Sequence, residues 1–224
     1  MSMKQAANYR TYWSSKLPEL TSSSVILEVG AGIGSNLALF LEKEIRVVAL
    51  EPDSYNRDII KKEHAEWVKN GFLRVISNFS ELTSEDKFDL LVYIDVLEHI
   101  YSDNEELQRS VKFIQTSGHL LVIVPAHPSL FSEFDKSIGH FRRYSNSSLK
   151  KIIPEELQIK YVGKIDPLGL FGVIFNKFFR RKNVSIKQVE IWDKFFVPIS
   201  WQLDKVVTKG RVGKSIILLA QNEN

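Results

Sequence analysis

Three closely spaced glycines directly follow an apolar run near the start of this chain. The run covers residues 25–29, is rich in β-branched side chains, and leads into Gly30, Gly32 and Gly34 in the pattern G-x-G-x-G. This order predicts a buried parallel strand, a tight turn and the start of a helix. Glycine is needed where the backbone turns sharply, or where a ligand must approach it without an intervening Cβ. The segment therefore predicts an α/β sheet with a ligand site at the turn.

A carboxylate ends the next apolar run, some twenty residues further along the chain. This second run covers residues 45–50, and Glu51 follows it directly. A carboxylate at the tip of the second strand of a βαβ unit lies where a ribose can present its two hydroxyls. Together with the glycines, Glu51 predicts a nucleoside-containing cofactor.

The glycine spacing distinguishes between classes of nucleoside cofactor. Dinucleotide-binding loops have the pattern G-x-G-x-x-G, and here Ser35 occupies the last position of that pattern. Glu28 precedes the loop, and its charge would repel a pyrophosphate. It suits a cationic ligand such as S-adenosylmethionine, which carries a sulfonium and an ammonium group. An NAD-linked oxidoreductase stays as an alternative that the spacing disfavours.

Apolar runs separated by polar and glycine-containing stretches predict strands that alternate with helices. Such alternation implies a parallel, doubly wound sheet with right-handed crossovers, in which ligands bind at the carboxyl ends of the strands. The predicted strands cover residues 25–29, 45–50, 72–77, 88–94, 118–125 and 215–220, and the predicted helices cover residues 7–17, 36–44, 53–70 and 103–116.

Several of these segments resemble motifs of the class I S-adenosylmethionine-dependent methyltransferases, in the order in which that family has them. Residues 28–34 are similar to the glycine-rich first motif, and residues 88–94, followed by Asp95, resemble the fourth-strand motif. Asn78 and Phe79 close the third predicted strand, where the family typically presents a polar side chain to the adenine amine.

This resemblance spans residues 17–149 and implies an α/β fold with a doubly wound, mostly parallel, seven-stranded Rossmann-like sheet. The last predicted strand would be antiparallel at the edge, and extra C-terminal helices would precede it. The implied cofactor is S-adenosyl-L-methionine. The predicted cofactor-binding residues are Glu28, Gly30, Gly32, Gly34, Glu51, Pro52, Asn78, Phe79 and Asp95.

A long connection after the predicted fifth strand carries the second informative motif. Residues 126–146 are too long for an ordinary strand-to-helix loop, and their aromatic and charged content argues against disorder. The segment resembles a methyltransferase subgroup, often associated with glycan or glycolipid modification, that has an Asp followed by G-H-x-R-R-Y. This resemblance puts five residues over the methyl group: Asp135, His140, Arg142, Arg143 and Tyr144. In the alternative interpretation, the two arginines are solvated and His140 only packs the loop.

Methyl transfer to a hydroxyl usually needs a general base, whereas an amine acceptor needs only to be neutral. His99 and His140 are the best base candidates, and Asp135 could orient one of them. His99 could instead only hydrogen-bond its own loop. No paired carboxylates or histidine clusters stand out at metal-ligand spacing, so no metal is predicted. The predicted catalytic residues are His140, His99, Asp135, Arg143 and Tyr144.

Aromatic and basic residues dominate the C-terminal third. Residues 168–182 are apolar and then sharply basic, and residues 191–201 repeat the aromatic character. This composition suits a peripheral membrane contact through residues 168–201, or an acyl or polyprenyl ligand. Alternatively these helices cover the sheet and one another, or form a homodimer face. Four phenylalanines align on one predicted helical stripe: Phe171, Phe175, Phe178 and Phe179.

Composition fits a single domain over residues 1–224. We expect a helical lid at residues 1–20, an active-site loop at 126–146 and a helical insertion at 167–210. The 224 residues contain no cysteine and 44% hydrophobic residues, enough for one substantial core without disulfides. A net charge of +3 is too small to indicate nucleic acid. No secretory signal or membrane-spanning run is evident, so we expect a cytoplasmic protein, or one peripheral at the membrane.

The sequence thus predicts a methyltransferase that acts on an O or N atom of a small-molecule, lipid-linked or sugar-linked acceptor. The main alternative is a non-catalytic S-adenosylmethionine-fold binding protein or partner subunit.

Overall fold

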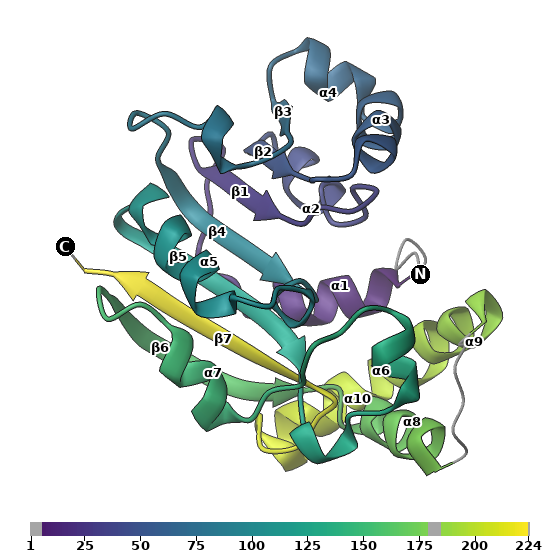
Figure 1. Cartoon of the computed structure of the whole chain (residues 1–224). Coiled ribbons are helices and arrows are strands. Elements are labelled where there is room, and N and C mark those ends of the chain that lie inside the picture. Colours follow the sequence, from purple (N-terminus) through teal and green to yellow (C-terminus); the bar gives the residue numbers. More distant parts are fainter. Residues whose placement is uncertain (1–5, 179–184, 224) are drawn as a thin grey trace.

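The computed structural model describes residues 6–178 and 185–223, which build one sheet with helices on both faces (Figure 1). The strands are β1 (Val25–Val29), β2 (Arg46–Leu50), β3 (Leu73–Ile76), β4 (Phe88–Ile94), β5 (Ile114–Pro125), β6 (Leu157–Ile165) and β7 (Ser215–Asn222). The α-helices are α1 (Ala7–Ser14), α2 (Ala38–Leu41), α3 (Ser54–Glu63), α4 (Ala65–Lys69), α5 (Asp103–Ser110), α6 (Glu133–Ser137), α7 (Asn146–Ile152), α8 (Pro167–Phe178), α9 (Ile186–Ile191) and α10 (Val197–Leu203). The predicted fold class is confirmed.

The sheet has the order β3-β2-β1-β4-β5-β7-β6, and the chain reverses its winding direction between β1 and β4. Strands β1 to β5 pair in parallel, and β7 runs antiparallel to both of its neighbours. The arrows of β4 and β5 point toward the end of the sheet where α8, α9 and α10 gather (Figure 1). The carboxyl ends of the parallel strands therefore face these C-terminal helices.

Both faces of the sheet are buried, which explains why its central strands are almost continuously apolar. On one face, Leu107 of α5 and Leu149 of α7 belong to a core cluster with alternate residues of the strands. On the other face, a second cluster includes Tyr12 of α1, Phe40 of α2 and Val197 of α10. The helices near the two ends of the described chain thus share one layer.

The edge of the sheet differs in detail from the sequence prediction. The last predicted strand is antiparallel as expected, but β6 pairs along its outer side, so β7 lies one place in from the edge. The sequence analysis did not identify β6, because its burial is irregular and its register shifts between Ile159 and Tyr161.

The fifth strand begins earlier than predicted. It starts at Ile114 rather than at Gly118, so the predicted helix over 103–116 is too long. Gly118 lies inside the strand, where a Cβ would come within 2.8 Å of the Phe88 carbonyl oxygen. The glycine therefore permits a close backbone approach within the sheet instead of starting the strand.

Helix α1 is held by the C-terminal helices rather than by a cap of its own. The Asp193 carboxylate, from the π-helical turn η6 (Trp192–Phe196), accepts hydrogen bonds from the backbone N–H groups of Asn8 (3.0 Å) and Tyr9 (2.8 Å). A carboxylate at this position satisfies free N–H groups and offsets the positive end of the helix. These hydrogen bonds join the segment predicted as a lid (residues 1–20) to the predicted helical insertion (residues 167–210).

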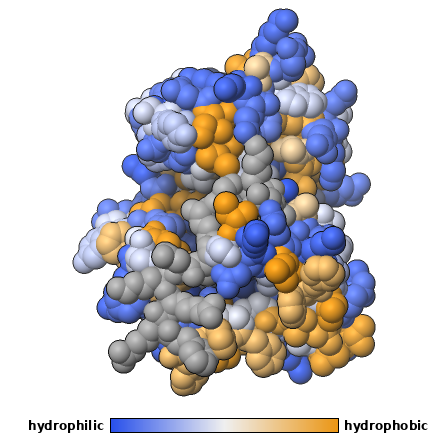
Figure 2. Space-filling view, turned by 90° about the vertical axis from the view of Figure 1, so that its right-hand side faces the viewer, coloured by the Kyte–Doolittle hydropathy of each residue, from blue (hydrophilic) through white to orange (hydrophobic). Residues whose placement is uncertain are grey.

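The predicted aromatic stripe does not pack inside the molecule. The exposed fractions are 69% for Phe171 and 79% for Phe178, whereas Phe179 and the basic residues 180–182 lie outside the described residues. Figure 2 looks at this end of the molecule and shows apolar surface over its lower part. Within the described ranges, no helix combines the length and apolar content that crossing a bilayer requires.

Candidate functional site

The three glycines of the first turn have different surroundings, although all have a positive φ of +69°, +57° and +82° in chain order. A Cβ on Gly30 would lie 2.6 Å from Val96, and one on Gly34 would lie 2.9 Å from Leu37. A Cβ on Gly32 would meet no described atom within 4 Å. Gly30 and Gly34 are thus needed for close packing, and Gly32 is the position where a ligand could approach the backbone.

Glu51 binds this glycine turn through its side chain. Its carboxylate accepts hydrogen bonds from the N–H groups of Gly32 (2.7 Å) and Asp53 (3.0 Å). The two oxygens of an ionised carboxylate offer further lone pairs, so Glu51 can still accept from ribose hydroxyls. The carboxylate therefore fixes the turn while it lies at the end of β2, where the sequence predicts the ribose.

Glu28 is buried at the end of β1 with one oxygen unsatisfied. Oε1 accepts a 2.8 Å hydrogen bond from the Asn36 side-chain amide, and Oε2 has no partner in the described part of the chain. Burial raises the pKa of Glu28 to about 7, and the Asn36 hydrogen bond opposes this rise. A ligand cation would supply the missing partner. Glu28 and the open position at Gly32 therefore fit a cationic nucleoside cofactor.

The raised pKa of Glu28 predicts a specific pH dependence of stability. The folded-state pKa is about 7 against 4.5 in the unfolded chain, so the folded state holds its proton to higher pH. Stability is unaffected below about pH 4.5, falls between about pH 4.5 and 7 by about 3 kcal/mol in total, and levels off above pH 7. In denaturant titrations of the cofactor-free protein, Glu28→Gln should remove this part of the loss. Identical pH profiles for both proteins would contradict the assignment.

The remaining residues predicted to bind cofactor differ in exposure. Asn78 is exposed and caps the turn η2 (Phe79–Glu81) by accepting from the Ser80 N–H at 2.8 Å. Pro52 is also exposed. The Phe79 ring is buried and stacks on Phe113 at 5.6 Å, so it serves the core.

Asp95 marks the end of β4 with a left-handed backbone conformation. Its φ is +53°, which is unfavourable for a residue with a Cβ, and its N–H is held by the Ile123 carbonyl at 2.9 Å. Desolvation by the surrounding protein raises the pKa of Asp95, whereas the positive charges of Lys214, His140 and Arg143 lower it. Strained residues of this kind are concentrated at functional sites.

Asp95 lines a cavity of about 810 Å³, which lies between the sheet edge and the C-terminal helices. This volume lies in the range of small-molecule sites. The polar end of the cavity is lined by Asp95, Glu98, His99, His140, Arg143 and Lys214, and its apolar walls include Phe134, Leu168, Phe171, Phe175, Trp192 and Phe196. The cavity could therefore hold an acceptor with a polar head and an apolar body.

The predicted loop motif contributes His140 and Arg143 to this polar end. Asp135, fully buried in α6, accepts hydrogen bonds from His140 Nδ1 (3.1 Å) and Arg143 Nε (2.8 Å). These partners and Ser132 outweigh the effect of burial and lower the pKa of Asp135 to about 2. Asp135 does not line the cavity, and its contact with His140 fits the orienting role that the sequence analysis gave it.

Two other residues of the motif, Tyr144 and Arg142, contact Asp103 instead of lining the cavity. The Tyr144 hydroxyl donates to Asp103 at 2.6 Å, and Arg142 pairs with the same carboxylate at 2.8 Å. Tyr144 is buried in the core, and neither residue lines the cavity. Asp103 at the start of α5 therefore anchors this part of the loop, and the placement of Tyr144 and Arg142 over a methyl group stays a prediction from the resemblance.

His99 and Glu98 reach the polar end from the turn η3 (Leu97–His99) after β4. The His99 and His140 rings pack edge to face, with 4.6 Å between their ring centres. Desolvation and the nearby charge of His140 lower the pKa of His99, and a backbone hydrogen bond to Gly139 opposes this. Burial, reinforced by the Asp95 charge, raises the pKa of Glu98 well above its usual range.

Sequence analysis missed Lys214 as a cavity residue. Its ammonium group lies 3.5 Å from the Asp166 carboxylate and 3.6 Å from the centre of the Trp192 ring. Because β7 is antiparallel, its first residues lie at the carboxyl edge of the parallel strands. That reversal is the signal that could have identified Lys214 from the predicted topology.

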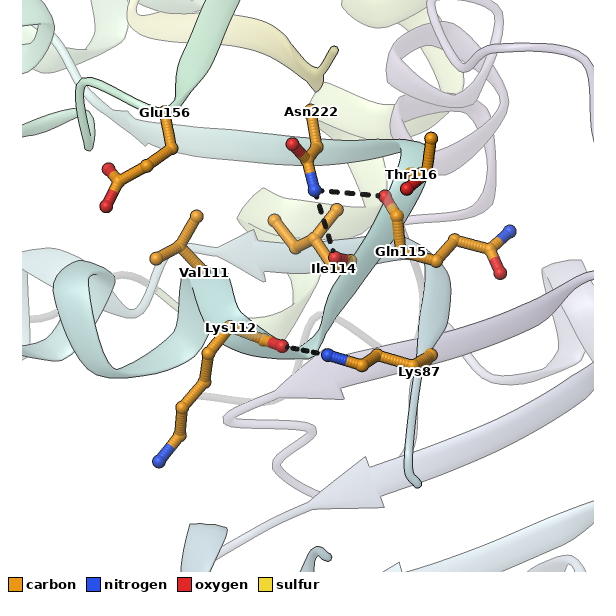
Figure 3. A pocket seen from close by; sticks show the side chains of 8 residues that line it. All are labelled: Lys87, Val111, Lys112, Ile114, Gln115, Thr116, Glu156 and Asn222. Atoms are coloured by element: carbon orange, nitrogen blue, oxygen red, sulfur yellow. Dashed lines mark hydrogen bonds between the residues drawn. The ribbon is translucent and has the colours of Figure 1, made fainter. Parts of the chain in front are cut away.

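A second cavity, of about 690 Å³, lies away from all of these residues (Figure 3). It is open and lies where β5 begins and β7 ends, next to Lys87 and Lys112. The Lys87 ammonium donates to the Lys112 carbonyl at 2.6 Å, and the Asn222 amide donates to the Ile114 carbonyl at 3.2 Å. This cavity lies at the opposite end of the strands from Asp95 and carries none of the predicted chemistry.

Comparison with protein families gives one match. A family model described as a methyltransferase domain matches residues 6–157. No curated protein matches the chain significantly.

Solved structures share the fold at low sequence identity. A Bacillus halodurans protein described as a candidate methyltransferase is 17% identical, with full coverage of both chains and a TM-score of 0.62. Coclaurine N-methyltransferase bound to N-methylheliamine and S-adenosylhomocysteine is 13% identical, with 96% of this chain and 72% of that chain covered and a TM-score of 0.63. Phosphoethanolamine N-methyltransferase 2 of Haemonchus contortus, in complex with S-adenosylmethionine, is 14% identical and has a TM-score of 0.65. The match covers 97% of this chain and 53% of that chain.

Proposed function

Since the chain belongs to the methyltransferase-domain family, we propose that it transfers the methyl group of S-adenosylmethionine to an acceptor bound in the 810 Å³ cavity. The observation that carries this proposal is the pairing of two adjacent features at the carboxyl edge of the sheet. On one side, the unsatisfied oxygen of Glu28 and the open position at Gly32 suit a cationic nucleoside. On the other, Asp95 borders an amphipathic cavity of acceptor size.

The residues around these features have separable roles in the proposed reaction. Glu51 would hold the ribose and Glu28 the positive charge of the cofactor, which supplies an electrophilic methyl group when bound. In such a transfer the acceptor atom would form the new bond to the methyl carbon, and the electron pair of the broken carbon–sulfur bond would stay on sulfur. The proton of a hydroxyl acceptor passes to His140 Nε2, because Asp135 holds Nδ1. The apolar walls exclude water and orient the acceptor.

The shape of the cavity supports an acceptor class. A polar end with cationic and carboxylate groups suits a hydroxyl or amine head group, and walls of phenylalanine and tryptophan suit a ring or an acyl chain. We therefore propose O- or N-methylation of an amphipathic small molecule, with a lipid-linked or sugar-linked acceptor as the specific candidate.

Isothermal titration and a labelled methyl donor test this proposal in two steps. We expect saturable binding of S-adenosylmethionine and S-adenosylhomocysteine, and no binding of NAD. Incubation with labelled S-adenosylmethionine and a cell extract, followed by separation into lipid and aqueous phases, should transfer label mainly to the lipid phase. NAD binding would favour an oxidoreductase. Cofactor binding without label transfer to any fraction would favour a non-catalytic binding protein or partner subunit.

We also propose that the exposed stripe of α8 contacts an anionic membrane surface next to the cavity mouth. Phe171 lines the cavity and is 69% exposed, and two exposed lysines, Lys187 and Lys194, lie on helical segments that also line the cavity. Inserting an exposed ring into the interface gains about 1–2 kcal/mol.

The protein should therefore sediment with vesicles that contain anionic lipid, and less so at high salt. Phe171→Ser/Phe178→Ser should weaken this sedimentation at least tenfold. Tyr55→Ser is a matched control, because Tyr55 is 73% exposed on α3, away from the cavity. Equal sedimentation of all three proteins would contradict membrane contact, and a stable dimer that hides the stripe would favour a homodimer face.

A further inference from the structure

Three potential metal ligands converge at the polar end of the cavity, although the sequence analysis predicted no metal site. Ligand atoms of Glu98, His99 and His140 all lie within 4.8 Å of one another. Glu98 and His99 are neighbours in sequence, but His140 comes about forty residues later. Only the fold of the 126–146 loop brings the second histidine to the first, so no short motif in the sequence shows the set.

Glu98 lacks the partners that a buried carboxyl group normally has. Its side chain is fully buried, and neither oxygen has a hydrogen-bond partner among residues 6–178 and 185–223. The nearest positively chargeable atom is His140 Nε2, at 3.7 Å from Oε1. Buried polar groups in native proteins are almost always paired, so these two oxygens indicate a partner that the chain itself does not provide.

His140 is held as metal-binding histidines are held. Its Nδ1 lies 3.1 Å from the Asp135 carboxylate, which Ser132 and Arg143 also bind. The carboxylate keeps the proton on Nδ1 and leaves the lone pair on Nε2, the atom that faces Glu98. His99 offers a second imidazole from the cavity side, with the two rings 4.6 Å apart.

We propose that Glu98, His99 and His140 bind one late first-row divalent cation such as zinc, with a further coordination position open to the cavity. Two histidines and one carboxylate are a known donor set for such ions, whereas magnesium and calcium prefer oxygen ligands alone. Ligands about 2.0–2.2 Å from a tetrahedral ion stand roughly 3.4 Å apart, so side-chain rotation would complete the set.

The ion's role in the reaction rests on the proposed function. Without the ion, His140 Nε2 is the base, as proposed above, whereas with the ion bound that lone pair is a ligand. The ion would then bind the oxygen of a hydroxyl acceptor and favour loss of its proton, which would pass to the Asp95 carboxylate that also lines the cavity. Binding of the ion does not depend on that function, so it can be tested without cofactor or acceptor.

Metal-stripped protein should be titrated with Zn²⁺ against a chromophoric chelator, and with Co²⁺ by its visible absorption. We expect one Zn²⁺ per chain and a Co²⁺ spectrum of low coordination number. Glu98→Gln, His99→Gln and His140→Gln should each weaken Zn²⁺ binding at least tenfold. His119→Gln is the matched control, because His119 lies in the middle of β5, six residues before Pro125, which lines the cavity. Mg²⁺ should not compete with Zn²⁺.

The proposal fails if metal-stripped protein takes up no Zn²⁺, or if His119→Gln weakens binding as much as the three ligand variants do. Circular dichroism of each variant separates loss of a ligand from loss of the fold. Asp135→Asn adds a second readout, because it leaves all three ligands in place and should still weaken Zn²⁺ binding tenfold or more by releasing His140. Zn²⁺ binding without methyl transfer would contradict the proposed function alone, and methyl transfer by metal-stripped protein without Zn²⁺ uptake would contradict this site alone.

Discussion

Gly32→Val should abolish S-adenosylmethionine binding, with affinity reduced more than a hundredfold. Around the ideal Cβ position of Gly32, the described part of the chain leaves a space of at least 4 Å. The valine side chain would fill this space, where the cofactor is proposed to approach the backbone. A β-branched residue is also strained at a φ of +57°. Isothermal titration with S-adenosylhomocysteine measures the loss directly.

Gly71→Val is the matched control for this prediction. Gly71 also has a positive φ, of +77°, and open space around its ideal Cβ, but it lies in the turn before β3. Both variants should lose a similar 1–2 kcal/mol of stability from backbone strain, and only Gly32→Val should lose the cofactor. Equal loss of affinity in both would mean that strain, and not the occupied space, causes the effect.

His140→Ala should lower the methyl-transfer rate about 10²- to 10⁴-fold while the affinity for S-adenosylhomocysteine stays unchanged. The imidazole lines the acceptor cavity, and its contacts with Asp135 fix its orientation. It makes no contact with the glycine turn, so the cofactor should bind as before. Rates measured with labelled cofactor at saturating acceptor, together with cofactor titration, separate the two effects.

Phe141→Ala serves as the control in the same loop, because the Phe141 side chain is 54% exposed, meets the Tyr101 ring edge to face and does not line the cavity. It should leave the rate nearly unchanged. A normal rate in His140→Ala, combined with a large loss of cofactor affinity, would assign the loop to the cofactor instead.

Features encoded within a few consecutive residues could be predicted from the sequence. The glycine turn, Glu51 and Asp95 each follow directly from an apolar strand, and the structure has them at the carboxyl ends of β1, β2 and β4. Their positions depend mainly on local periodicity and on the rule that parallel strands end at one edge. Sequence reasoning is strong where backbone geometry alone decides position.

Features that depend on a distant partner could not be predicted. The sequence places Tyr144 in the site because its motif is contiguous. In the structure, its hydroxyl donates a hydrogen bond to Asp103 of α5. Glu98 and His140 meet only through the fold of the intervening loop. The direction of a polar side chain in a long loop depends on which distant group is its hydrogen-bond partner. No local sequence pattern contains that information.

The insertion of β7 between β5 and β6 has a consequence for how the chain is made. Strand β6 pairs only with β7 within the described sheet, so the outer edge of β5 stays unpaired until residues 215–222 have been synthesised. About a hundred residues separate the end of β5 from the end of β7, which a ribosome adds in roughly 5–20 s. During that interval, a long apolar strand edge is open to other chains. The nascent protein should therefore depend on a holding chaperone at this stage, and slowing translation downstream of residue 125 should lower its yield.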